Sequence, residues 1–217
     1  MSSPSRFRLV ILISGGGGLM RRAVHAAAVE HAPFCVTRVI ASRADAAGLD
    51  VARSAGVETA VVRGNAPVSQ QHEIWREIEA GEPQGVMLLG WLHRLHVPPP
   101  WMHRVVNVHP SLLPLFGGKG MWGHHVHEAV LAAGVRVSGC TYHFVDEHYD
   151  TGPIVAQYAV PVEDADTVDA LADRVIGMQH LSLVPFLEAW SSGRIRLEGG
   201  RWVGAPAAAG LRMHAGL

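Results

Sequence analysis

Short apolar runs alternate with helical patterns through the first half of this chain. The runs are rich in β-branched residues and mostly end at Gly, Ser or Pro, which is typical of buried parallel strands. They cover residues 8–14, 35–42, 59–64, 85–91 and 104–110. Helical patterns that end at a glycine occupy residues 45–56 and 72–81. This alternation predicts a Rossmann-like α/β fold, an open, mostly parallel twisted sheet with helices on both faces.

The second half of the chain adds two strand-like segments, residues 136–146 and 152–163, in which apolar and polar positions alternate as in partly exposed strands. They bring the sheet to about seven strands, one of them antiparallel. We expect a helix around residues 127–133 and a long one over residues 167–190, opened by a Thr cap and an acidic turn. A single domain over residues 7–203 and a loosely ordered Ala/Gly-rich tail over residues 204–217 complete the prediction.

Composition narrows the classes of function. The 217 residues are 48% hydrophobic and 17% charged, with a net charge of −1, which indicates a globular protein rather than a partner of nucleic acid or of an anionic membrane. The apolar run near the start, residues 9–13, is far too short to span a bilayer. The two cysteines form no CxxC pair. We therefore expect a cytoplasmic protein that acts on small molecules.

A glycine-rich loop, Gly15–Gly18, follows the first strand and leads into a helix. Glycines let the backbone approach a ligand, and a helix N-terminus offers free N–H groups, so a phosphate would fit there. The dinucleotide pattern GxGxxG fails, because Met20 or Arg21 stands where its third glycine is needed. The loop predicts either a phosphate site or a tight strand-to-helix turn.

Asn107 and His109 lie two residues apart at the end of an apolar strand, so they share a face of the sheet. A carboxamide beside an imidazole can stabilise an oxyanion and move a proton, although such a pair is also common as a structural hydrogen-bonded unit. The acidic, turn-forming segment 143–153 favours the catalytic interpretation, because one of its carboxylates next to His109 would raise the pKa of the imidazole.

The chain contains 14 histidines, which raises the question of a metal site. His124 and His127 are spaced i, i+3 on the predicted helix, but the sequence nearby supplies no obvious third ligand. We therefore expect no metal and interpret these histidines as the polar start of a helix. The glycines of residues 117–123 predict a mobile loop at the mouth of the site.

Four segments together resemble the phosphoribosylglycinamide formyltransferases, folate-dependent enzymes of the formyltransferase superfamily: "DAAGLDVARSAGV", "NVHPSLLP", "GGKGMWGHHVHEAVLAAG" and "VSGCTYHFVDEHYDTGPIVAQ". The resemblance extends from about residue 8 to residue 203. It implies the formyltransferase fold and the transfer of a formyl group from 10-formyltetrahydrofolate to the glycinamide amine of 5′-phosphoribosylglycinamide in de novo purine biosynthesis. It implies no metal.

The resemblance also assigns roles to residues. Asn107, His109 and Asp150 match the catalytic residues: the first two would stabilise the oxyanion, and Asp150 would keep His109 protonated. The folate would contact Asn107 and a set of other residues, namely Leu92, His93, Arg94, Leu95, Thr141, His143 and Asp146. The substrate phosphate would lie on the glycine loop, at Gly16, Gly17, Gly18, Leu19, Met20 and Arg21, and Gln179 would contact the acceptor ribose.

Three features depart from the family's pattern. Gly18, Leu19 and Met20 replace small polar residues, His93 stands where the family often has Arg, and Gln179 replaces an acidic residue. These departures motivate an alternative, a folate-dependent formyltransferase that acts on another amine such as an amino sugar. A binding protein that has lost the reaction is disfavoured, because the catalytic residues all remain. The sequence leaves a homodimer open.

Overall fold

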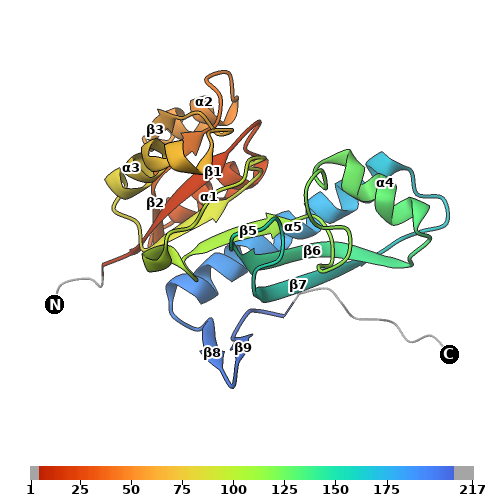
Figure 1. Cartoon of the computed structure of the whole chain (residues 1–217). Coiled ribbons are helices and arrows are strands. Elements are labelled where there is room, and N and C mark those ends of the chain that lie inside the picture. Colours follow the sequence, from red (N-terminus) through yellow and green to blue (C-terminus); the bar gives the residue numbers. More distant parts are fainter. Residues whose placement is uncertain (1–4, 208–217) are drawn as a thin grey trace.

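The computed structural model describes residues 5–207 of the chain. Its seven-stranded sheet has the order β3-β2-β1-β4-β5-β6-β7 (Figure 1). The strands are β1 (Phe7–Ile13), β2 (Phe34–Ala41), β3 (Glu58–Val61), β4 (Gly85–Leu88), β5 (Val105–His109), β6 (Val137–Phe144) and β7 (Ile154–Pro161). Strands β1 to β5 pair in parallel, and β6 runs antiparallel to both of its neighbours. The predicted α/β sheet, including its single antiparallel strand, is confirmed.

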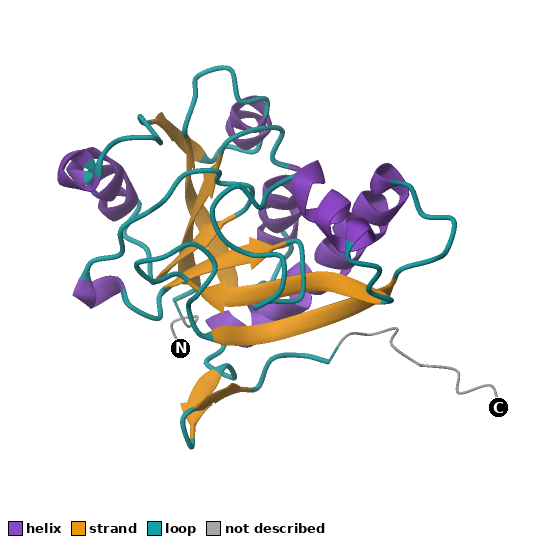
Figure 2. Cartoon of the chain, turned by 45° about the vertical axis from the view of Figure 1, so that its right-hand side comes forward, coloured by secondary structure: helices purple, strands orange, loops and turns teal. Residues whose placement is uncertain are grey.

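Helices cover both faces of this sheet (Figure 2). The α-helices are α1 (Gly18–Ala27), α2 (Gly48–Ser54), α3 (His72–Ala80), α4 (His124–Ala132) and α5 (Val168–Ser191), and two 3-10 turns are η1 (Val68–Gln70) and η2 (Pro99–Trp101). One apolar core joins the sheet to α1, α2 and α5, and a second joins its other face to α3 and the segment before β5. Alternate residues of β1 serve both cores: Leu9 and Ile11 face the first, Val10 and Leu12 the second.

The observed elements differ from the prediction in a few places. The α4 helix begins at His124, about one turn before the expected start. A small hairpin of β8 (Arg196–Glu198) and β9 (Arg201–Val203) follows α5, and the sequence pattern did not reveal it. The long helix α5 begins as expected, because the Thr167 hydroxyl accepts a hydrogen bond from the N–H of Ala170 at 3.1 Å. Most of the predicted tail, residues 208–217, lies outside the described residues.

No helix in the described range, residues 5–207, is long and apolar enough to cross a membrane.

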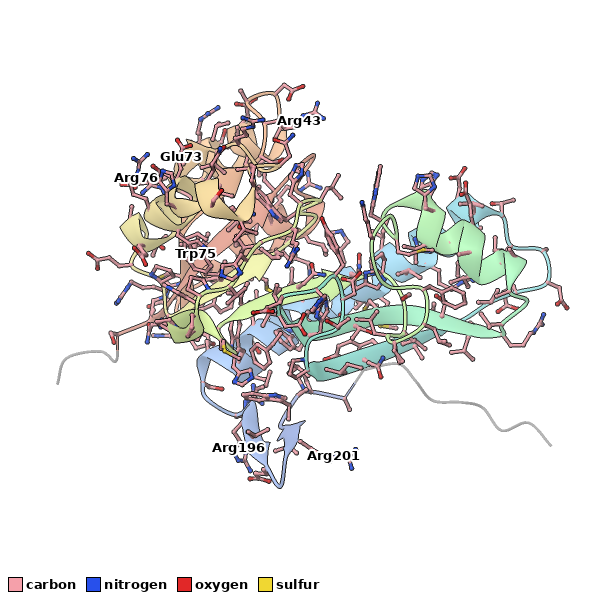
Figure 3. The ribbon with its side chains drawn as sticks, viewed as in Figure 1. Arg43, Glu73, Trp75, Arg76, Arg196 and Arg201 are labelled. Carbon is pink, nitrogen blue, oxygen red and sulfur yellow. The ribbon has the colours of Figure 1, made fainter. Side chains whose placement is uncertain are left out.

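Helix α3 anchors the segment that follows β4. Trp75 points inward from α3 while Glu73 and Arg76 point outward (Figure 3). The Trp75 indole N–H donates to the carbonyl of His96 at 2.9 Å, and the ring packs on Trp101. The loop between β4 and β5 therefore has a defined path across the carboxyl end of the sheet, where parallel α/β sheets place their ligands.

Candidate active site

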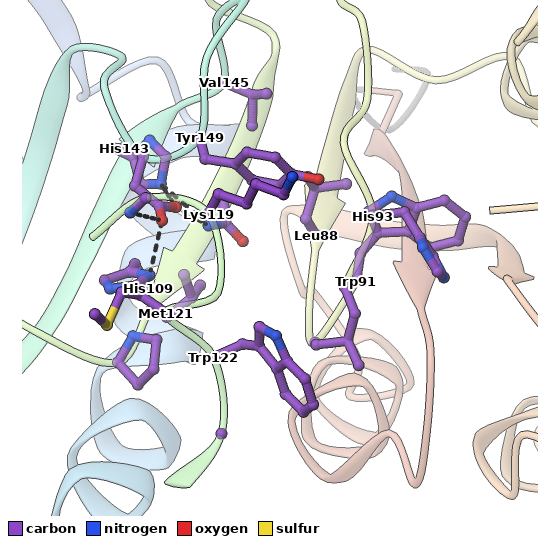
Figure 4. A pocket seen from close by; sticks show the side chains of 18 of the residues that line it. Leu88, Trp91, His93, His109, Lys119, Met121, Trp122, His143, Val145 and Tyr149 are labelled. Atoms are coloured by element: carbon purple, nitrogen blue, oxygen red, sulfur yellow. Dashed lines mark hydrogen bonds and ion pairs between the residues drawn. The ribbon is translucent and has the colours of Figure 1, made fainter. Parts of the chain in front are cut away.

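A cavity of about 530 Å³ opens at the carboxyl ends of β4 and β5. His109 and His143 line one side of it and Trp91 and His93 the other (Figure 4). The loop of residues 118–123 forms part of its wall, and helices α4 and α5 contribute further residues. A cavity of this volume suits a small organic substrate with a few polar groups.

Asn107, His109 and Asp150 meet in this cavity although Asp150 lies far along the chain. The Asp150 carboxylate places Oδ2 3.5 Å from Nδ1 of His109 and Oδ1 3.4 Å from Nδ2 of Asn107. The loop of residues 117–123 holds the same carboxylate, because the Gly118 N–H donates to Oδ2 at 2.9 Å. Tertiary structure thus brings together the three residues that the sequence assigned to catalysis.

His143 completes the arrangement from the neighbouring strand. In the β5–β6 pairing it lies directly opposite Asn107, and its Nε2 is 3.1 Å from the Asn107 amide nitrogen. The other ring nitrogen, Nδ1, lies 3.0 Å from the carbonyl of Phe144. Because a carbonyl only accepts, Nδ1 carries the proton, and Nε2 is left to accept from the Asn107 amide. This contact fixes the direction in which the carboxamide points.

The imidazole of His109 is almost completely buried. Its Nε2 donates to the carbonyl of Phe116 at 2.9 Å, and its Nδ1 faces Asp150. Burial lowers the pKa of His109, and this effect outweighs the opposing influence of Asp150 and of the Phe116 carbonyl. The expectation that Asp150 would keep His109 protonated is therefore not met: the carboxylate acts in the expected direction, but desolvation prevails.

Asp150 remains ionised. Burial alone would raise the pKa of its carboxyl, but the neighbouring imidazoles of His143 and His109 and the Gly118 N–H together lower the pKa below its usual value. The site therefore combines an anionic carboxylate with a buried imidazole whose pKa is lowered. That combination suits a reaction in which a proton moves as an oxyanion forms.

The segment after β4 forms the wall opposite the catalytic residues. Leu92, His93, Arg94 and Leu95 all line the cavity, as the resemblance implied. The end of β1 fixes the start of this wall, because the Ser14 hydroxyl accepts from the N–H of Leu92 at 3.0 Å. His93 lies against Gly64, where any Cβ would overlap its ring, and burial lowers the pKa of His93.

The glycine loop leads directly into α1. Gly17 has φ of 67°, a left-handed conformation that favours glycine, and a Cβ there would stand 2.9 Å from the end of the Met20 side chain. The first helical bond runs from the Arg21 N–H to the Gly17 carbonyl, which leaves the N–H groups of Gly18, Leu19 and Met20 without a partner inside the helix. Of the loop residues predicted to hold a phosphate (Gly16, Gly17, Gly18, Leu19, Met20 and Arg21), Leu19 is the one that lines the cavity.

The side chains of two residues predicted to contact a ligand, Met20 and Thr141, do not reach the cavity. The Met20 side chain is fully buried in the core, so this residue can offer a ligand only its N–H. Thr141 is also fully buried and does not line the cavity. Its hydroxyl donates to the carbonyl of Ser111 at 2.7 Å and accepts from the N–H of Leu113 at 3.0 Å. The predicted folate contact of Thr141 is therefore wrong, and the residue instead holds the turn after His109.

The remaining predicted residues, Asp146 and Gln179, do line the cavity. Sequence reasoning missed several others, namely Leu88, His124, His127, Ala172 and Ile176. The i, i+3 spacing of His124 and His127 was the available signal: both lie at the start of α4, as expected, and both also line the cavity. Within residues 5–207 no group of three or more His, Cys, Asp or Glu side chains could hold a metal ion.

Comparison with known proteins identifies the family. A model of the formyl transferase family matches residues 7–187. The chain belongs to the formyl transferase family. It is 37% identical over 199 residues to the chloroplastic phosphoribosylglycinamide formyltransferase of Vigna unguiculata. The aligned region covers 88% of this chain and 62% of the plant protein. The chain therefore spans less than two thirds of that relative.

Solved structures agree with this assignment. The phosphoribosylglycinamide formyltransferase of Anaplasma phagocytophilum superposes with a TM-score of 0.82 at 31% identity, covering 93% of this chain and 96% of the other. The phosphoribosylglycinamide formyltransferase of Brucella melitensis superposes with a TM-score of 0.76 at 36% identity, covering 89% of this chain and 100% of the other. The resemblance carried by the four sequence segments is confirmed.

Proposed function

We propose that the protein transfers a formyl group from 10-formyltetrahydrofolate to the glycinamide amine of 5′-phosphoribosylglycinamide, a step of de novo purine biosynthesis. One observation carries this proposal: Asn107, His109 and Asp150 converge at the end of a cavity whose opposite wall is the segment 92–95. The relatives named above carry this acceptor in their names. The folate supplies an activated formyl group; the protein supplies the orientation and the proton transfer.

In the proposed reaction the amine attacks the formyl carbon, and the carbonyl electron pair moves onto oxygen. The Asn107 amide N–H donates to this oxyanion, and the His109 imidazole takes up the proton that the attacking amine releases, relayed through water and Asp150, so that a cation faces the negative charge. The same proton then returns through Asp150 to the departing folate nitrogen. The carbonyl then re-forms as the bond between carbon and that nitrogen breaks.

The N-terminus of α1 is the proposed site for the acceptor phosphate. It offers the free N–H groups of Gly18 and Leu19 and the positive end of a helix dipole. His180 on α5 lies beside it: a Cβ on Gly18 would stand 3.7 Å from Nε2 of the imidazole. Burial lowers the pKa of His180, and the charges of Arg22 and Arg21 lower it further. Both arginines are therefore close enough to add positive charge to this site.

A second acceptor, an amino sugar, is supported by the same loop, because Gly18 and Leu19 carry no polar side chain that would select a phosphate. Purified protein with 10-formyltetrahydrofolate should show saturable release of tetrahydrofolate when phosphoribosylglycinamide is added. Glucosamine, an amino sugar without a phosphate, serves as the competing acceptor at the same concentrations. Turnover with the amino sugar alone would overturn the leading proposal in favour of the second, and turnover with neither would overturn both.

We also propose a cytoplasmic location. Its support is that Cys35 and Cys140 are both free and that burial raises the pKa of the Cys140 thiol to about 12. Unpaired cysteines of this kind are usual in a reducing compartment.

A further inference from the structure

A second, smaller cavity of about 300 Å³ shares Asp150 with the substrate cavity described above. Gly118, Tyr149 and Asp150 line both cavities, so these residues form the partition between them. The rest of the second cavity comes from the turn after β5, the loop of Asp150 and the start of β7, namely Leu113, Pro114, Gly117, Thr151, Gly152 and Ile154. Tyr149 and Ile154 are 38% and 39% exposed, so this cavity opens to the solvent.

The lining of the second cavity offers a proton few partners. Among the residues that the structure describes, Asp150 is the one carboxylate that lines it. The Thr151 hydroxyl is already engaged, because it donates to the Asp146 carboxylate at 2.8 Å. Apart from the Tyr149 phenol, the other lining groups are apolar side chains and backbone. Water that enters this cavity therefore exchanges protons chiefly with Asp150.

Gly117 keeps the approach to Asp150 open. A Cβ at this position would stand 2.5 Å from a methyl group of Leu113, 3.1 Å from the Cβ of Asp150 and 3.7 Å from its Oδ2. The φ of Gly117 is not in the left-handed region, so its backbone conformation does not require glycine. The space beside the carboxylate does require it.

Two imidazoles face Asp150 from the sheet. Nδ1 of His109 on β5 is 3.5 Å from Oδ2, and Nε2 of His143 on β6 is 3.6 Å from Oδ1. Lys119 and Asp146 also line the substrate cavity, but within residues 5–207 neither forms an ion pair with Asp150. Both imidazoles line the substrate cavity and not the second one. Asp150 is therefore the group that connects the catalytic residues to the second cavity.

The proposed reaction creates a need for such a connection. An α-amino group like that of the glycinamide has a pKa of about 7.7–8.0, so most of the acceptor is an ammonium ion at neutral pH. An ammonium has no free electron pair, and it must lose one proton before it can attack. The proton that the amine loses during attack returns to the folate nitrogen, so only the extra ammonium proton has to reach the solvent. By then the two substrates fill the cavity through which they entered.

We propose that the second cavity is a water-filled route by which the extra proton of the bound acceptor passes from Asp150 to the solvent. In this step an N–H bond of the ammonium breaks and its electron pair stays on nitrogen. The proton binds the Asp150 carboxylate, directly or through one water, and then moves to water in the second cavity, which restores the carboxylate. The inference rests on the proposed function and adds to it the proton exchange that prepares the acceptor.

The test fills the second cavity with the variant Ile154→Trp. Ile154 is the first residue of β7 and lines this cavity but not the substrate cavity, and strands accept aromatic residues well. At saturating substrates we expect kcat to fall about 10-fold at pH 6.5, where roughly one acceptor amine in twenty is uncharged, and to change less than about twofold at pH 9. At the higher pH the acceptor binds as the free amine and needs no route for a proton.

Three further variants complete the design. Val137→Trp is the matched control, because Val137 is an exposed residue at the start of β6 that lines neither cavity; it should leave kcat unchanged at both pH values. Ile154→Ala widens the second cavity and should also keep the wild-type kcat. Ile154→Phe adds a smaller ring and should give a smaller loss confined to low pH, which keeps the test decisive if Ile154→Trp does not fold.

An unchanged kcat of Ile154→Trp at pH 6.5 would overturn the inference. An equal loss at pH 6.5 and pH 9 would overturn it as well, because a structural disturbance does not depend on the protonation of the acceptor. Turnover with glucosamine alone would remove the proposed acceptor but not the route. The same comparison of pH values would then use glucosamine, whose amine is also largely protonated at pH 6.5.

If the wild-type protein turns over neither acceptor, the proposed function fails, and proton exchange tests the route separately. NMR of the protein with isotope-labelled histidines, at saturating tetrahydrofolate, measures how fast the His109 ring proton exchanges with water. We expect this exchange to be about 10-fold slower in Ile154→Trp than in the wild type. Equal rates in the two proteins would overturn the inference.

Discussion

Asp150 has a backbone φ of 59°, a left-handed conformation that few residues other than glycine, Asn and Asp adopt readily. This conformation turns its carboxylate back toward β5, where it reaches His109, Asn107 and the Gly118 N–H. Strained backbone at a functional residue persists only where its surroundings hold it. The position therefore tolerates Asn on steric grounds, and Asn differs from Asp there chiefly in charge.

The Asp150→Asn variant should consequently fold and lose activity. Without the carboxylate, no anion accepts the proton from the amine, and we expect kcat to fall by about 100-fold or more. The matched control is Glu147→Gln in the same loop, which removes an exposed charge that does not line the cavity. Steady-state formyl transfer measures both variants. If Asp150→Asn kept more than a third of wild-type kcat, Asp150 would have no catalytic role.

At the scale of elements, the cavity wall of residues 92–95 depends on helix α3 and the turn before it, which lie outside the cavity. The Gln71 side chain donates to the carbonyls of Ala66 and Arg94 and accepts from the N–H of His96. Together with the Trp75 contact to the same segment, these bonds fix the backbone of residues 92–97. The wall is a loop, but its conformation is set by a helix.

Replacing Gln71 with Leu should therefore affect the folate more than the acceptor. Three buried hydrogen bonds are lost, so we expect the free energy of unfolding to fall by about 1–3 kcal/mol and the folate KM to rise about 10-fold. The acceptor KM should change by less than about threefold. Gln70→Leu is the control, because Gln70 is exposed. Urea denaturation measures the change in stability, and initial rates measure the two KM values. Equal increases in the folate KM and the acceptor KM would contradict the prediction that this wall contacts the folate and not the acceptor.

At the scale of the whole molecule, histidines couple stability to pH. Burial lowers the pKa values of four of them, His93, His109, His127 and His180. Below about pH 6.5 these imidazoles become protonated in the unfolded chain but stay neutral in the folded protein, where their pKa values are lower. The unfolded state therefore binds more protons. Their stabilising contribution is present above that pH and is lost as the pH falls toward their lower folded values.

We therefore expect the free energy of unfolding to decrease between pH 7.5 and pH 5, before most carboxylates titrate. Urea denaturation at fixed ionic strength across this range measures the effect. The His127→Gln variant should show a shallower decrease, because one proton fewer is taken up on unfolding. A pH-independent free energy of unfolding in the wild-type protein over this range would contradict the prediction.

The sequence by itself determined the sheet and the shared face of Asn107 and His109. Apolar runs and a period of two are local properties, so they identify buried strands and the face of each residue without knowledge of the fold. The pairing of Asp150 with His109 also came from sequence, but through the resemblance of whole segments and not through spacing. The hairpin β8–β9 escaped prediction because its strands are only three residues long.

Only the tertiary structure decided which side chains from distant elements share the cavity. Thr141 and His143 lie two residues apart on the same strand. The turn after His109 nevertheless covers Thr141, whereas His143 lines the cavity. Packing of α4 on α5 brings His127 to the same wall as Gln179, and desolvation lowers the pKa of His109 despite its carboxylate partner. Burial and desolvation depend on every element that surrounds a group, and local periodicity carries no record of them.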